Sequence, residues 1–402
     1  MLIQIFAFLL VGILAGTITG LIPGIHVNLI GIFIVSLSAS LLSSITPIYL
    51  VVFIASMAIA HTFIDFIPSI FLGCPDTDTE LSILPGHELL KKGQGYQAII
   101  LTCYGSLAAI FILILISFPS ILIISKIKNF IPLLIPGLLI LVLFFLISLE
   151  NKKLSALFVL LLTGFLGILI LNPNEILGKS IELTQPLFPL LTGLFGSSML
   201  VLSIKNKTQI PKQKITKPKI KILKPTLGAV IASPLCSFLP GLGSGQAAII
   251  GNTISKTDKK GFLVLLGATN TLVMGFSFIS LYIISKTRTG AAIAIQEIIG
   301  TLSWKILILI LIVVLISGII SFFLTTFLAK FFSQKITKID YTTLSIITLI
   351  FLGIIVFLVS GFLGLVILIA STFTGIYCIS LKVKRTNMMG CLLIPTIIFY
   401  LI

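Results

Sequence analysis

Two side chains that can carry a proton or bind a cation lie four positions apart in an apolar stretch. His61 and Asp65 occur in the segment HTFID, preceded and followed by mainly apolar residues. Residues i and i+4 of a helix share one face, so the two side chains are expected to be neighbours. Ionisable groups inside a membrane are costly and usually functional. The spacing favours a site that couples transport to H+ or a cation; the alternative is a buried structural pair.

A second acidic group follows in the segment GCPDTDTE at residues 73–80, which holds Asp76, Asp78 and Glu80. Three acids at alternate positions offer oxygen ligands for a cation, but the glycine and terminal glutamate of an EF-hand loop do not complete the pattern. A solvated loop or a helix cap explains these acids equally well. Asp76 is kept as a candidate for ion coupling.

Three polar residues interrupt an apolar segment near position 270. Thr269, Asn270 and Thr271 lie within GATNTLVMG, and their oxygens suit coordination of Na+ or hydrogen bonding to a carboxylate. The alternative is that they only form hydrogen bonds between helices, which is common in membranes. We expect Asn270 to contact substrate and Thr269 to contribute to ion coupling.

Two Pro-Gly breaks stand where spanning helices would otherwise continue, in LIPGIHVN at 21–28 and FLPGLGSG at 238–245. A helix that begins after such a break presents free N–H groups and a positive dipole end, which attract anions. The alternative is that proline and glycine only kink the helices for packing. The candidate substrate-binding residues are Pro23, Gly24, His26 and Asn28 at the first break, and Pro240, Gly241, Gly243, Ser244, Gly245 and Gln246 at the second.

The elements that hold these residues are predicted to be membrane helices. Only 9% of the 402 residues are charged and 57% are hydrophobic, and runs such as 108–125 and 304–329 approach or exceed the length that crosses a bilayer. The first twenty residues lack the features of a cleaved signal and are interpreted as the first membrane helix. The fold class is therefore an all-α polytopic membrane protein, located in the cell membrane.

The net charge of +16 does not indicate nucleic-acid binding, because the lysines lie between apolar segments, where they orient helices and contact anionic lipid headgroups. The five cysteines form no CxxC pair and no metal-ligand spacing with the three histidines. We expect neither a metal site nor a cofactor other than the coupling ion. The catalytic motifs GxSxG and HExxH and a P-loop lysine do not occur, so no enzyme is indicated.

A lysine-rich linker divides the chain. Residues 205–224 contain eight lysines and no acid, which predicts a cytoplasmic segment between an N-terminal membrane repeat at 1–204 and a C-terminal one at 225–402. A solvated basic loop is the simplest interpretation; a site for anionic lipid or for regulation is the alternative.

The two parts resemble each other and predict inverted-topology repeats with broken or re-entrant helices. A shift of 217 positions superimposes the two Pro-Gly breaks, together with a stripe of small residues before each. Small residues at every fourth position let a neighbouring backbone approach closely. The matched stripes are Gly12, Gly16 and Gly20 in the first part, and Ala229, Ser233 and Ser237 in the second.

The segments GTITGLIPGIH, FLPGLGSGQAA, GCPDTDTELSILPGHELLKKGQG and GATNTLVMG are similar to the large permease subunit of the tripartite tricarboxylate transporters, in a short form similar to the archaeal branch. The resemblance implies a permease that takes up carboxylates with an ion gradient, assisted by a small membrane subunit and a solute-binding protein. The family's Asn-Asn pair appears here as Thr269-Asn270, and its Pro-Gly-Thr element as Pro75-Asp76-Thr77. By position it implicates Pro23, Gly24, Pro240, Gly241, Gly243, Asn270 and Pro75 to Thr77.

These observations together predict a secondary transporter for a small organic anion, coupled to H+ or Na+ through alternating access. Two alternatives stay open from the residues. Helix ends bind phosphate as well as carboxylate, so the ligand could be an anionic lipid carrier such as polyprenyl phosphate. The polar breaks could also be packing features of a non-transporting membrane scaffold.

Overall fold

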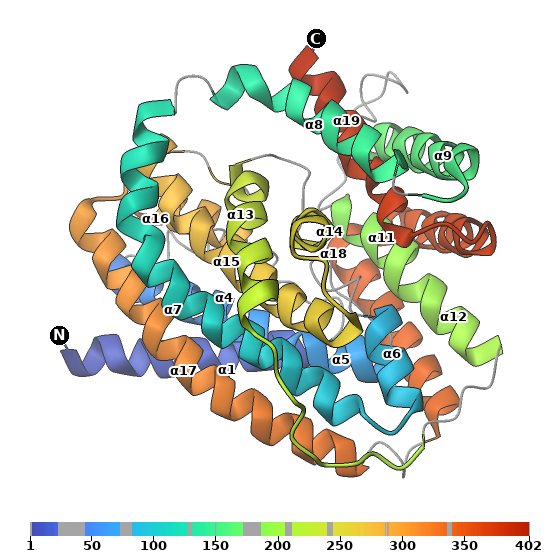
Figure 1. Ribbon diagram of the computed structural model, residues 1–402, viewed down its shortest axis with the longest axis horizontal. Coiled ribbons are helices and arrows are strands. Elements are labelled where there is room, and N and C mark those ends of the chain that lie inside the picture. The colour runs from blue at the N-terminus through green and yellow to red at the C-terminus, as the bar shows by residue number, and fades with distance from the viewer. Residues whose placement is uncertain are drawn as a thin grey trace.

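The computed structural model describes residues 2–22, 45–72, 83–127, 131–148, 150–171, 186–205, 211–238, 244–285, 287, 289–335 and 340–401. Over these residues every regular element is a helix and there is no strand (Figure 1). Eight of the helices described are long and apolar enough to cross a bilayer. The predicted all-α polytopic membrane fold is confirmed.

The first part of the chain contributes ten described elements. They are α1 (Leu2–Leu21), α4 (Pro47–Ile64), α5 (Phe66–Leu72), α6 (Ile83–Lys91), α7 (Gly95–Ile127), α8 (Ile131–Ser148), α9 (Lys153–Leu171), α11 (Leu187–Leu191), the π-helix η2 (Thr192–Ser197) and α12 (Ser198–Lys205).

The second part contributes eight. They are α13 (Leu223–Phe238), α14 (Ser244–Ser255), α15 (Lys259–Ile284), α16 (Gly290–Ile299), α17 (Trp304–Lys335), α18 (Tyr341–Ser380), the 3-10 helix η4 (Arg385–Met389) and α19 (Gly390–Leu401). The 40-residue α18 is two helical segments that meet at Gly361, where φ is 66°.

Two spans are covered by other helices over almost their whole length. In the α4–α5 span, Pro47–Phe71, and in α15, 94% of the most apolar window is buried, against 33% in α1 and α18. The spans with low burial carry large exposed apolar side chains, such as Ile3 and Leu358, that suit contact with lipid. Polar side chains on α4 and α15 therefore meet protein instead of lipid.

The predicted small-residue stripe of α1 packs on α4. A Cβ added at Gly16 would lie 2.3 Å from the carbonyl oxygen of Met57, and one at Gly20 would lie 3.0 Å from the Cβ of Ile64. The two backbones therefore approach more closely than side chains on α1 would allow. The matching residues of α13 face inward as well, since Ser233 and Ser237 are buried and the Ser237 hydroxyl lies 3.3 Å from the carbonyl oxygen of Val273 on α15.

The helices α7 and α15 interlock through a pair of glycines. A Cβ at Gly105 would lie 1.9 Å from the carbonyl oxygen of Val264, and one at Gly267 would lie 2.0 Å from that of Thr102. The Ser106 hydroxyl donates a hydrogen bond of 3.0 Å to the carbonyl oxygen of Gly267. This contact joins the first part of the chain to the second and fixes the position of α15.

The helices α13 and α14 form a hairpin around the second Pro-Gly break. A Cβ at Gly228 on α13 would lie 2.4 Å from the carbonyl oxygen of Gly251 on α14, and these residues are equally distant in sequence from the break. With 16 and 12 residues, the helices are about 24 and 18 Å long, less than the ~30 Å of a bilayer core. The chain therefore enters and turns back, as expected for a broken or re-entrant helix.

The buried apolar residues form two main cores, and each core takes helices from both parts of the chain. The first core contains residues of α1, α4 to α7 and α15 to α17. The second contains residues of α8, α9, α11, η2, α18, η4 and α19, while α13 and α14 contribute to both. In Figure 1, α8, α9 and α19 lie together at one side of the molecule and α1, α7 and α17 at the other.

The lysine-rich linker is docked on the helices over residues 211–222, which we call the strap. The Gln213 side chain accepts a hydrogen bond of 2.7 Å from the Gly95 backbone N–H and donates one of 3.1 Å to the Leu90 carbonyl. The Gln97 amide donates to the Thr216 hydroxyl at 2.6 Å. These bonds hold the strap across the start of α7 (Figure 1).

A prediction follows from the glycine interlock. Gly267→Ala should sharply reduce the thermal stability and the yield of folded protein, because the added methyl group has no room against the α7 backbone. Gly353→Ala is the control, since a Cβ at that helical position meets nothing within 4 Å. That variant should be neutral or slightly more stable, by up to about 1 kcal/mol. Equal behaviour in thermal unfolding of the detergent-purified proteins would contradict the interlock.

A second prediction concerns acid stability. Burial lowers the pKa of His87 on α6 from 6.5 to about 4, and the positive charges of Lys91 and Arg385 act in the same direction. The unfolded chain binds this proton below about pH 6.5 and the folded chain does not, so stability from this group is lost as pH falls from 6.5 toward 4. His87→Gln should remove up to about 3 kcal/mol of that loss. Thermal unfolding at pH 7.5 and pH 4.5 measures it, and an unchanged difference between the two pH values would contradict it.

Candidate functional site

Asp65 lies at the junction between α4 and α5, inside a continuous buried span. Its backbone N–H still bonds the His61 carbonyl at 3.0 Å, and its own carbonyl accepts the Ser69 hydroxyl at 2.7 Å. Proline at 68 cannot donate to the helix ladder, which explains why the helix is irregular here. The junction holds the carboxylate within the protein, where the residue is only 3% exposed.

Asn270 of α15 contacts this carboxylate directly. Its side-chain nitrogen donates a hydrogen bond of 2.8 Å to Oδ2 of Asp65 and lies 3.4 Å from the carbonyl oxygen of Thr62. The two residues are 205 positions apart in the sequence. The structure therefore joins an ion-coupling candidate from one part of the chain to a substrate-binding candidate from the other.

A pair of threonines extends the contact between the same helices. The hydroxyl oxygens of Thr62 and Thr271 lie 3.2 Å apart, and the Thr62 hydroxyl donates to the Ile59 carbonyl at 2.8 Å. A hydroxyl has one proton to donate, so Thr271 is the donor toward Thr62. Both threonines are buried, and the face of α15 that carries Asn270 and Thr271 thus meets α4 through polar groups.

His61 contacts a different helix. Its Nδ1 lies 3.0 Å from the hydroxyl of Thr19 on α1, and that hydroxyl also lies 3.1 Å from the Gly16 carbonyl. One turn of α4 therefore has a titratable group toward α1 and, four residues later, another toward α15. The predicted placement of His61 and Asp65 in a buried polar environment is what the structure has.

These groups together can bind a proton or a small cation. A carboxylate that accepts an amide hydrogen bond is stabilised in its charged form, whereas burial favours the neutral form, so its charge depends on small local changes. Oxygens of Asp65, Asn270, Thr62 and Thr271 belong to the hard ligands that cations such as Na+ prefer. The cluster suits the reversible binding of a cation.

The other predicted residues have varied outcomes. Ser244 and Gly245 are buried in the first turn of α14, and the backbone of Gln246 follows in the same turn. The Thr269 hydroxyl donates within its own helix, 3.0 Å from the carbonyls of Leu265 and Leu266. Nine predicted residues lie outside the described residues: Pro23, Gly24, His26, Asn28, Asp76, Thr77, Pro240, Gly241 and Gly243.

Sequence reasoning missed Thr19 and Thr62. Thr62 is three residues before Asp65, so the helical repeat alone puts both on one face, and that spacing was a usable signal. Thr19 lies one residue before Gly20, at the edge of the small-residue stripe. Its contact with His61 depends on how α1 is rotated against α4, which the local sequence does not determine.

The order of these helices and polar groups agrees with comparison to known proteins. The sequence profile described as the "Tripartite tricarboxylate transporter TctA family" matches residues 6–390. The chain belongs to this family. An uncharacterised protein of Methanocaldococcus jannaschii is 32% identical over 409 residues, which cover 98% of each chain. No solved structure matches this TctA-family chain.

Membership in the TctA family makes the chain one of a family of transporters, not of enzymes. With eight candidate spans among the helices described, it is a multi-pass protein of the cell membrane. The likeness to the large permease subunit, first noted in the sequence segments around Pro240 and Asn270, is confirmed.

A prediction tests the hydrogen bond across α4 and α15. Asn270→Ala should lower the free energy of unfolding by about 1–3 kcal/mol, because the variant removes a donor from a buried carboxylate. Thr269→Ala, the adjacent control, removes a hydroxyl that bonds only within its helix in the contacts above and should cost less. Chemical denaturation in mild detergent measures both. Equal losses, or a greater loss for Thr269→Ala, would contradict the assignment.

Proposed function

We propose that this chain is the permease of a secondary transporter that moves a small organic anion, a carboxylate, by alternating access coupled to H+ or Na+. The observation that carries the proposal is the buried hydrogen bond between Asp65 and Asn270. A family of transporters supplies the general activity, and a titratable carboxylate between two covered spans supplies a means of coupling.

The proposed coupling works through charge. A negatively charged Asp65 repels a carboxylate substrate, and this repulsion falls when the carboxylate is protonated or binds Na+. Cation binding also competes with the Asn270 amide for the same oxygen, which weakens the link between α4 and α15. Loading of the cation therefore favours substrate binding and changes the contact between two buried helices. His61, Asp76, Thr77 and Thr269 are the further candidates for this role.

The proposed substrate site lies at the helix starts beyond the two Pro-Gly breaks. The first turn of α14 begins at Ser244, which is buried, and Gly245 follows it. Free N–H groups at a helix start bind carboxylates well, and glycine allows a ligand close to the backbone. This supports Ser244, Gly245 and Gln246, with Pro240, Gly241 and Gly243 before them, Pro23, Gly24, His26 and Asn28 in the other break, and Asn270, as the residues that bind the anion.

We further propose that the two parts of the chain are inverted repeats. The α4–α5 span ends beside α6, where Gly86 packs on Ile70, and α15 begins beside the same helix, where Lys259 pairs with Glu88. The two buried spans therefore run in opposite directions. The matched small-residue stripes of α1 and α13, each packed on one of these spans, also support the inversion. Partners in the proposal are a small membrane subunit, a solute-binding protein and membrane lipids.

The test of the proposed function uses purified protein in proteoliposomes with an imposed pH or Na+ gradient. Asp65→Asn should abolish gradient-driven accumulation of labelled citrate, or of whichever carboxylate stabilises the protein in a thermal-shift panel, while binding of that carboxylate persists. Asp340→Asn is the matched control, because Asp340 is exposed and caps α18, where asparagine caps equally well.

Two results would contradict the proposal. Undiminished accumulation in the Asp65→Asn variant would return Asp65 to a structural role. Stabilisation by polyprenyl phosphate but by none of the carboxylates would favour a lipid carrier, and no stabilisation by either class would favour a scaffold.

A further inference from the structure

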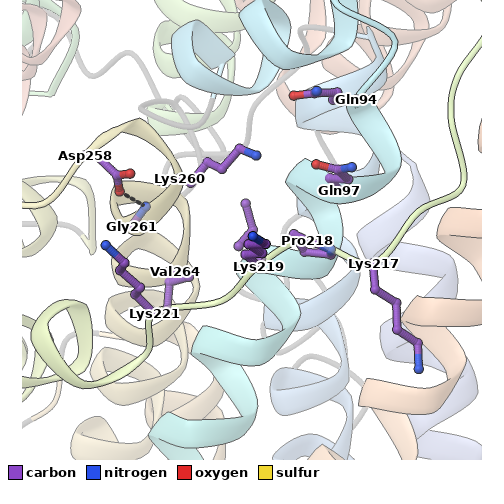
Figure 2. A pocket seen from close by; sticks show the side chains of 11 residues that line it. Gln94, Gln97, Lys217, Pro218, Lys219, Lys221, Asp258, Lys260, Gly261 and Val264 are labelled. Carbon is purple, nitrogen blue, oxygen red and sulfur yellow. Dashed lines mark hydrogen bonds between the residues drawn. The ribbon is translucent and has the colours of Figure 1, made fainter.

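A cavity of about 350 Å³ lies between the strap, the start of α7 and the start of α15, at a distance in the sequence from every transport residue named above. Figure 2 shows Gln94 and Gln97 on the α7 side, Lys219 and Lys221 on the strap, and Lys260 on α15. The complete lining adds Leu101, Lys217, Pro218, Asp258, Gly261 and Val264.

The charge of the lining is strongly positive. Four lysines and one aspartate line the cavity, and the aspartate is engaged, since Asp258 accepts the Gly261 backbone N–H at 2.8 Å as the cap of α15. In Figure 2, Lys260 extends from α15 toward the strap and Lys217 points away from the other lysines. Two helices begin at this cavity, and their positive dipole ends add to the field.

The strap sequence explains how the lysines come to face the cavity. Residues 217–222 read KPKIKI and have no helical structure, so alternate side chains point to opposite sides. Pro218 is buried and Ile220 packs on the first apolar core, whereas Lys217, Lys219 and Lys221 are exposed. The alternation of apolar residues and lysines therefore docks one side of the strap and presents a row of charges on the other.

The spacing of these charges selects a class of ligand. Lysines at alternate positions of an extended chain are about 6–7 Å apart, which is too far for one singly charged carboxylate to contact several of them. An ammonium group is a compact point charge, and both lysines and helix starts bind phosphate oxygens. A ligand with two or more negative charges suits this row, and the volume lies at the lower end of small-molecule sites.

We propose that this cavity binds a phosphate-bearing polyanion, in addition to the transport site. Bound there, the ligand bridges the strap and α15 and so strengthens the docking of the linker on the helices. The phosphate chemistry is shared by two sources, a soluble phosphate compound and the headgroup of an anionic lipid. Both can reach this end of the bundle if it faces the cytoplasm, as its lysines indicate.

The test compares two pairs of lysine substitutions with the same loss of charge. Lys219→Gln with Lys260→Gln removes two lysines of the cavity, whereas Lys212→Gln with Lys214→Gln removes two exposed lysines of the strap that do not line it. Pyrophosphate binding to detergent-purified protein is measured by calorimetry. The cavity pair should weaken the affinity about tenfold or more, and the control pair should change it less than threefold.

The lipid source has its own measurement. Native mass spectrometry of protein extracted from vesicles of phosphatidylglycerol and phosphatidylcholine counts bound phosphatidylglycerol in the same variants, and circular dichroism verifies that each is folded. Loss of pyrophosphate binding in the cavity pair alone supports a soluble phosphate ligand, and loss of bound phosphatidylglycerol in that pair alone supports a lipid headgroup. Equal losses in both pairs, citrate binding as tight as pyrophosphate, or no binding of either probe would overturn the proposal. None of these outcomes depends on transport through Asp65.

Discussion

The burial of the Asp65 carboxylate between two covered spans constrains the rest of the structure. A charged group removed from water is costly unless hydrogen bonds replace its hydration, so α15 must bring an amide within hydrogen-bond distance of it. That requires helix backbones closer together than large side chains permit. The glycines of α1, and the pair Gly105 and Gly267 between α7 and α15, supply this close packing. Thr62 and Thr271 keep the same contact polar beyond the carboxylate.

What the sequence predicted correctly depends on local spacing. Runs of apolar residues indicate membrane helices whatever surrounds them, and an interval of four residues defines one helix face, so the spans, the α1 stripe and the placement of His61 and Asp65 on one helix follow from the chain alone. The triplet at 269–271 was also identifiable, because polar residues are rare in such segments. The inverted arrangement of the two parts stays a prediction.

What the sequence did not reveal depends on contacts between distant segments. Asp65 and Asn270 were assigned to different roles because spacing says which residues share a face and not which helix covers that face. The same reason explains the strap: its lysines suggested a solvated loop, whereas Gln213 and Thr216 form bonds that dock it on α7. The helix starts at the two breaks were proposed from dipole electrostatics, and the buried first turn of α14 is the described part of that arrangement.

The two apolar cores cross the division of the chain at the linker, and this has a mechanical consequence. α7 from the first part and α15 from the second share one core and interlock through glycines, so they cannot slide apart without loss of that packing. The chain passes from the first core to the second between α7 and α8, and again between α17 and α18. A motion that preserves both cores must therefore move one core as a rigid body against the other, with hinges at these connections, and the α13–α14 hairpin, which contributes to both, lies on the shear surface.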